Sequence, residues 1–130
     1  MDINDLKRVP MFADLPRKQL AMAARLADEL EVEQGARLVD EGRFAHEFFV
    51  IEAGTADVLH DEKVLAQLGP GDFFGEIALV TMGRRTASVV AASPMKLIVI
   101  FGPNFNDLTA TMPDVKKKID QAIEERCAQL

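Results

Sequence analysis

The first thirty residues have the apolar spacing of a helix. Apolar side chains recur every three to five positions along LPRKQLAMAARLADEL, a spacing that places them on one helix face. The residues on this face are Leu15, Gln19 or Leu20, Ala23, Leu26 and Leu30. Pro16 suits a first helical turn, and VPMF at 9–12 predicts a break between two short helices. We therefore predict helical structure over residues 2–30.

The pattern changes at Val32, where short apolar runs alternate with glycine. The runs are rich in Val, Ile, Leu and Phe, and the glycines between them are Gly35, Gly42, Gly54, Gly69, Gly71 and Gly75. Short runs at regular turn spacing are typical of a β-sandwich or a small β-roll. A brief helix is predicted over 76–82, after which TASVVAAS and MKLIVIF are predicted to form two further strands.

Helical spacing returns after Phe101-Gly102-Pro103, where the β portion ends. We predict helices over about 103–111 and 114–129, with Asp114 as a plausible N-cap of the second. One stripe of this last helix holds Val115, Ile119, Ala122 or Ile123, Arg126 and Leu130. The three lysines at 116–118 are expected on a solvated face. The order of elements predicts a single α+β domain over 1–130.

Within this domain we expect N-terminal helices over 1–30, a β-roll over 31–101 and C-terminal helices over 102–130. The net charge of −6 and the pI near 4.9 argue against broad binding of nucleic acid or of an anionic membrane. No stretch has the length of a membrane span or a signal peptide. The only cysteine, Cys127, cannot form an internal disulfide, which favours a reducing, cytoplasmic location.

The stretch GDFFGEIALVTMGRRTASVV, residues 71–90, contains the candidate chemistry. Glu76 begins the predicted short helix, whose first backbone amides have no partner within the helix and can bind an anion. Gly75 allows a ligand to approach the backbone closely. Arg85, nine residues after Glu76, can grip a phosphate at two oxygens. The small residues Ala78 and Ala87 leave space for such a guest.

Glu76 would repel a phosphate unless it faces another part of the ligand. A carboxylate accepts a hydrogen bond well from a ribose hydroxyl, so the combination favours a compact sugar phosphate with few negative charges. A nucleoside triphosphate is disfavoured, because the chain has no GxxxxGK[ST] motif and this loop has no lysine.

FGEIAL followed by RRTASV resembles the phosphate-binding cassette of the cyclic-nucleotide-binding domain family. This family includes regulatory subunits of protein kinase A, cyclic-nucleotide-gated channels and the bacterial catabolite activator. VPMFADLPRKQL is similar to its leading helices and EGRFAHEFFVIEAGTADV to its β-roll, so the resemblance spans nearly the whole chain. It implies an antiparallel, jelly-roll-like β-roll with a cassette over 73–89, a short cassette helix and C-terminal helices of the B and C type.

The resemblance also implies a binding module rather than an enzyme, with cAMP or cGMP as ligand and no metal or other cofactor. Arg85 would pair with the phosphate and Glu76 with the ribose 2′-hydroxyl. The implied ligand-binding residues are Gly75, Glu76, Ile77, Ala78, Arg85, Thr86, Ala87 and Ser88. Thr86 could reach a guanine amino group, but similar cassettes occur in channels that favour cAMP, so it does not decide the base.

The chain has no Trp or Tyr to stack on the base, which favours an aliphatic cap from the last helix. The candidates are Ile119, Ile123, Arg126 and Leu130, and simple packing of that helix on the roll is an equal alternative for each. Ligand binding would draw residues 114–130 across the roll, with 101–104 as the hinge. A protein effector is expected. Direct DNA binding is not, because no basic recognition helix follows the sensor.

Two other readings stay open at this point. A degenerate family member could bind no nucleotide and serve only as a docking surface, although Glu76 and Arg85 are both present. A metal enzyme of the cupin kind needs clustered histidines, whereas this chain has only His46 and His60 and no HxH motif. Cys127 on a terminal helix is better explained by packing or partial exposure than as a nucleophile.

Overall fold

The computed structural model describes residues 2–40, 47–75 and 87–128. Two helices come first, α1 (Ile3–Leu6) and α2 (Arg17–Leu26), and two come last, α4 (Gly102–Thr111) and α5 (Pro113–Ala128). The described strands between them are β1 (Ala27–Val32), β2 (Arg37–Val39), β3 (Glu47–Ala53), β4 (Ala56–His60), β5 (Lys63–Leu68), β6 (Phe73–Phe74), β7 (Ser88–Ala91) and β8 (Met95–Phe101).

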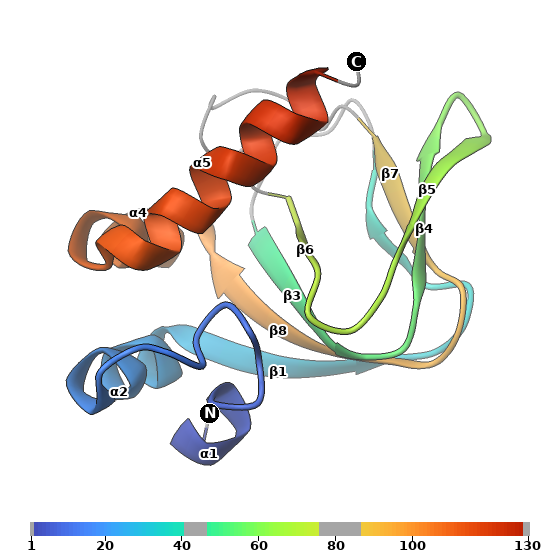
Figure 1. The fold of residues 1–130 in the computed structure, drawn as a ribbon. Coiled ribbons are helices and arrows are strands. Elements are labelled where there is room, and N and C mark those ends of the chain that lie inside the picture. The colour runs from blue at the N-terminus through green and yellow to red at the C-terminus, as the bar shows by residue number, and fades with distance from the viewer. Residues whose placement is uncertain (1, 41–46, 76–86, 129–130) are drawn as a thin grey trace.

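The strands form two antiparallel four-stranded sheets that face each other as a β-roll. One sheet has the order β1-β8-β3-β6 and the other β2-β7-β4-β5. The helices lie beside the β1-β8-β3 side of the roll, and the β4-β5 hairpin lies at the opposite side (Figure 1). The structure confirms the predicted α+β fold, an antiparallel roll with helices at both ends.

The β-roll begins earlier in the chain than the helical spacing indicated. Residues 27–30, predicted as helix, belong to β1, which pairs with β8 from Ala27↔Ile100 to Val32↔Met95. The sequence ADELEV also fits a strand, because it presents its acidic residues to solvent while Ala27 is buried. Pairing with an apolar neighbouring strand outweighs a weak helical preference. The prediction of helix up to residue 30 was therefore wrong at its end.

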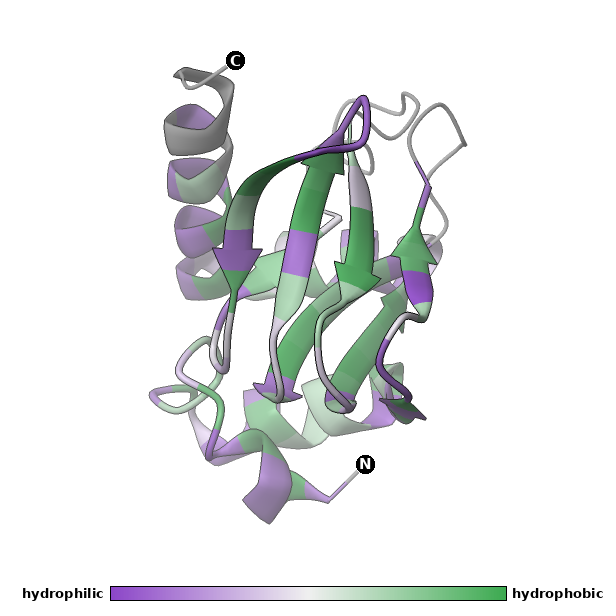
Figure 2. Cartoon of the chain, turned by 90° about the vertical axis from the view of Figure 1, so that its right-hand side faces the viewer, coloured by the Kyte–Doolittle hydropathy of each residue, from purple (hydrophilic) through white to green (hydrophobic). Residues whose placement is uncertain are grey.

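The two middle strands of the β1-β8-β3-β6 sheet, β8 and β3, are buried on both faces. On β3, Phe48 and Val50 contact the helices, whereas Phe49 and Ile51 point into the roll. Strand β8 alternates in the same way, since Ile98 and Ile100 join the helical cluster. Because successive side chains of a strand point to opposite faces, a strand covered on both sides reads as one continuous apolar run. Figure 2 shows such continuous green along strands of the roll.

The C-terminal helices match their predictions to within one residue at the described ends. Phe101 is the last residue of β8 and Gly102 the first of α4, as the sequence indicated. Asp114 is the second residue of α5, in its first turn, and so is not the N-cap. Val115 and Ile119 are buried among the helices. Lys118 departs from the expected solvated face because it is half-buried.

The half-buried carboxylate of Glu52 lies on β3, which β8 separates from β1. Lys96 Nζ lies 3.6 Å from Glu29 Oε2 and 3.9 Å from Glu52 Oε2, while Glu52 Oε1 is buried without a hydrogen bond. Burial raises the pKa of the Glu52 carboxyl, Glu29 and Asp5 raise it further, and Lys96 and Arg8 oppose the shift. Glu29, and then Glu52, raise the pKa of the Lys96 ammonium.

Replacing Glu52 with glutamine should remove a loss of stability that the wild type undergoes as the pH rises above 4.5. A carboxyl whose pKa is raised on folding binds its proton more tightly in the native state, so stability falls as pH rises above the unfolded value of 4.5. We expect the advantage of Glu52→Gln over wild type in urea unfolding to grow from pH 4.5 to pH 7. Glu31→Gln, at an exposed carboxylate of β1, is the control. A difference that stays constant with pH would contradict this account of Glu52.

Candidate functional site

The two described ends of the cassette lie on different sheets. Strand β6 is its first part and lies at the edge of one sheet, pairing Phe49↔Phe74 and Val50↔Phe73 with β3. Strand β7 contains its last residues and lies inside the other sheet, pairing with β4 and β2. Residues 75–87 therefore connect the two sheets, with an antiparallel ladder holding the chain at each end.

Phe73 and Phe74 place one ring on each side of their sheet. The Phe73 ring lies 5.6 Å from the Phe48 ring, which in turn lies 4.9 Å from Phe105 of α4. The Phe74 ring stacks on Phe49 at 4.8 Å inside the roll. Aromatic pairs at such distances contribute more than their buried area alone. The entry to the cassette is thus packed against α4 on one face and the roll core on the other.

Two glycines near this entry have backbone conformations that favour glycine. Gly75 has φ +93° and Gly71 has φ +90°. The turn before β6 is held by Gly71 N–H to the Ile51 carbonyl at 2.8 Å and Ile51 N–H to the Asp72 carbonyl at 2.9 Å. A side chain at Gly75 would strain this backbone, so the glycine is required by conformation as well as by the close approach expected of a ligand.

Ser88, at the start of β7, is buried and bonds to a neighbouring strand. Its Oγ accepts a hydrogen bond of 3.3 Å from Arg37 Nη2, and Arg37 Nε donates to Asp40 Oδ1 at 2.7 Å. Ser88 is 2% exposed. The contact joins residues 51 positions apart, so sequence spacing gave no signal for Arg37. Arg37 therefore steadies the strand that leaves the cassette.

The structure describes three of the eight expected ligand-binding residues. Gly75 lies at the entry, and Ala87 and Ser88 lie at the exit. The others, Glu76, Ile77, Ala78, Arg85 and Thr86, lie outside the described residues, as does the helix predicted over 76–82. The sequence analysis also did not single out Phe73 and Phe74 as supports of the entry. Two adjacent aromatics before a glycine were the available signal, since neighbours on a strand must face opposite ways.

Among the candidates for the base cap, Ile119 is described in full. Its side chain is 1% exposed and packs in the helical cluster with Val115 and Leu108. In this arrangement Ile119 serves packing, the alternative that the sequence left open. The side chains of Ile123, Arg126 and Leu130 lie outside the described part.

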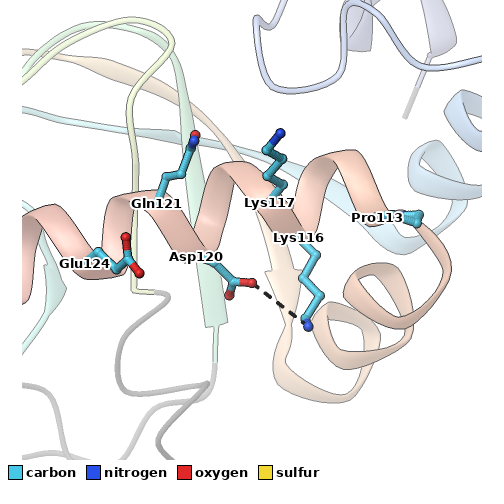
Figure 3. Close-up of a pocket in the computed structure, with 6 residues that line it drawn as sticks. All are labelled: Pro113, Lys116, Lys117, Asp120, Gln121 and Glu124. Atoms are coloured by element: carbon cyan, nitrogen blue, oxygen red, sulfur yellow. Dashed lines mark ion pairs between the residues drawn. The ribbon is translucent and has the colours of Figure 1, made fainter.

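The lining residues of the two described grooves do not belong to the cassette. One, of about 330 Å³, follows the outer side of α5 and is lined by Pro113, Lys116, Lys117, Asp120, Gln121 and Glu124 (Figure 3). Lys116 Nζ lies 3.9 Å from Asp120 Oδ2 across it, an exposed ion pair of adjacent helical turns. Its charged lining and wide opening describe a solvated helix surface rather than a nucleotide pocket.

Metal ligands do not gather in the described part of the chain. No group of three His, Cys, Asp or Glu side chains placed to hold an ion occurs there. His60 lies at the end of β4, where its Nε2 is 3.5 Å from Asp61 Oδ2. His46 lies outside the described residues. The cupin alternative gains no support from His60.

Among the described helices, none is both long and apolar enough to cross a membrane.

Known proteins are similar to this chain in sequence and in fold. A cGMP-dependent protein kinase of Drosophila melanogaster, isozyme 2, is 33% identical over 131 residues, covering 93% of this chain and 14% of the kinase. The catabolite activator protein of Thermus thermophilus superposes with a TM-score of 0.80 at 25% identity, covering 92% of this chain and 59% of that structure. The regulatory domain of Toxoplasma gondii protein kinase A, crystallised with cAMP, superposes with a TM-score of 0.70 at 27% identity. This match covers 82% of the present chain and 42% of that structure.

The chain spans only a small part of the kinase, so the catalytic activity of that protein is not carried over with the likeness. The common element is the regulatory module. The cyclic nucleotide-binding domain model matches residues 29–112, well over half of the chain and the whole of the expected cassette. This chain therefore belongs to the cyclic-nucleotide-binding domain family.

Proposed function

We propose that residues 75–88 bind cAMP or cGMP and that the chain is a regulatory sensor. The observation that carries this proposal is the cassette sequence itself, Glu76 and Arg85 at nine-residue spacing within a region matched by the family model. Arg85 and the backbone amides near Ile77 and Ala78 would hold the cyclic phosphate, and Glu76 the ribose 2′-hydroxyl. The ladders of β6 and β7 support the proposal, because they fix both ends of the segment.

Calorimetric titration of the purified chain with cAMP and with cGMP tests this proposal. We expect saturable binding of at least one of them, with AMP and GMP as controls that carry an open phosphate of higher charge. The compact site expected here neutralises one negative charge, so the open nucleotides should bind more weakly. Equal binding of cyclic and open nucleotides, or binding of none, would contradict the proposal.

We further propose that bound nucleotide draws the helix over 114–130 across the roll, with residues 101–104 as the hinge. A ligand shifts such an equilibrium only through its different affinity for the two positions of the helix. Phe101 and Gly102 lie at the junction of β8 and α4, which supports this place for a hinge. The moving helix would act on a protein effector. The lone Cys127 supports a cytoplasmic setting.

Ending the chain after Gln121 should weaken nucleotide binding roughly 5- to 100-fold by removing an aliphatic cap. This end point retains Val115 and Ile119, whose loss in a shorter chain would expose the helical core. Calorimetry with the preferred nucleotide provides the measurement, and a thermal melt checks that the fold persists. Glu124→Ala, on the exposed side of α5, is the control. Unchanged affinity in the shortened chain would reject the cap.

A further inference from the structure

Of the three lysines at 116–118, Lys118 is the one whose described hydrogen bonds reach a distant segment of the chain. Its Nζ donates hydrogen bonds to the carbonyl oxygens of Pro10 at 3.1 Å and Met11 at 3.3 Å. Lys117 is exposed, whereas Lys118 is half-buried. Lysine side chains usually extend the ammonium group into water. Both bonds of Lys118 instead join α5 to a segment more than 100 positions earlier in the chain.

The segment that receives these bonds is itself held in the helical core. Residues 7–15 form the turns between α1 and α2, and within them Val9, Met11 and Phe12 are buried. Val9 and Phe12 are also linked by the Phe12 N–H to Val9 carbonyl bond of 3.0 Å. A carbonyl outside a regular helix needs another donor, and a charged donor makes the stronger bond. Lys118 supplies that donor from α5.

The same segment touches the turn that leads into the cassette. A Cβ added at Gly71 would lie 3.3 Å from Pro10 Cγ and 3.5 Å from Pro10 Cδ, so the backbone of this turn lies against the proline ring. Gly71 is two residues before β6 and four before Gly75. Pro10 thus meets α5 through its carbonyl and the entry to the cassette through its ring.

We propose that Lys118 and Pro10 form a clamp that makes α5 and residues 7–15 move together when nucleotide binds in the cassette. This inference rests on the proposed function, because the event in question is nucleotide binding at 75–88. A displacement of the 69–72 turn would press on or release the Pro10 ring. The two Lys118 bonds would pass this displacement to α5. Coupling of this kind requires a contact whose strength differs between two arrangements, which a charged hydrogen-bond pair at a junction can provide.

Hydrogen exchange of the full chain tests the clamp, in wild type, Lys118→Met and Lys117→Met, each with and without saturating cGMP or cAMP. Methionine keeps the aliphatic length of lysine and removes its donors. Without nucleotide, Lys118→Met should speed exchange in residues 7–15 about fivefold or more, because local opening becomes easier. Lys117→Met should match wild type. With nucleotide, exchange in residues 113–121 of α5 should change in wild type. This change should be lost in Lys118→Met, because the Lys118 bonds carry the displacement from Pro10 to α5.

The outcomes separate the clamp from the proposed function. If wild type binds neither nucleotide, the proposed function fails and the inference fails with it. If wild type binds but residues 113–121 do not respond, or respond equally in Lys118→Met, only the clamp is overturned. Pro10→Ala keeps the backbone carbonyl and removes the ring, so it should also lose the response at 113–121, while exchange without nucleotide stays close to that of wild type. A full response in Pro10→Ala would overturn the route through Gly71.

Discussion

Replacing Arg85 with alanine is expected to weaken cyclic-nucleotide binding about 30- to 1000-fold, which corresponds to roughly 2–4 kcal/mol. The guanidinium group is the only side chain of the proposed site that brings a positive charge to the phosphate. Removing it would leave the phosphate to the backbone amides of the proposed site alone. Hydrogen bonds between charged groups are the strongest of those proposed here, so no other single substitution in the cassette should cost as much.

The chain offers a matched control one position earlier. Arg84→Ala removes the same charge from the same stretch but not the residue that the cassette pattern assigns to the phosphate. It should lower the affinity only slightly, by a long-range effect that salt screens. Calorimetry of both variants at two ionic strengths separates these effects. Equal losses of affinity in the Arg84 and Arg85 variants would mean that the positive charge of the stretch, rather than specific hydrogen bonds from Arg85, attracts the ligand.

Replacing Phe48 with alanine should lower the free energy of unfolding by about 3–5 kcal/mol, the usual cost of removing a buried phenylalanine. Phe48 is 0% exposed and lies between the rings of Phe73 and Phe105. Its removal leaves a cavity where β3, β6 and α4 meet. Chemical denaturation followed by circular dichroism measures this change.

Phe101→Ala provides the comparison for Phe48. Phe101 is 52% exposed at the end of β8, so its truncation should cost less than about 1 kcal/mol. A loss at Phe48 no larger than the loss at Phe101 would show that the Phe48 ring does not join the helices to the roll. Because Phe73 leads directly into the cassette, a nucleotide should also restore less stability to Phe48→Ala than to wild type.

The sequence predicted the strands of the roll well where both faces of a strand are buried. FFVI in β3 and LIVI in β8 are continuous apolar runs because both faces of their sheet are covered, and such runs are strong signals at short length. Residues 27–30 misled the prediction because their apolar spacing also fits the helix that precedes them. Only the ladder with Ile100 and its neighbours decides between the two, and that ladder involves distant residues.

The candidate site likewise combines residues that the sequence predicted with contacts that it did not predict. Glu76 and Arg85 could be proposed as ligand-binding residues from a local motif, since the expected chemistry depends on a short stretch of chain. The bond between Arg37 and Ser88, and the bonds of Lys118 to Pro10 and Met11, could not be predicted in this way. A run of three lysines gives no indication of which one faces the protein until the helix is placed on its neighbours. Contacts that join distant segments are therefore the part that required the structure.

A crystal structure of the chain grown with excess cyclic nucleotide tests the central claim most directly. We predict the cyclic phosphate between the Arg85 guanidinium and the amides that follow Gly75, with the ribose 2′-hydroxyl bonded to Glu76. A nucleotide found elsewhere, or a cassette filled by side chains of the protein itself, would contradict it.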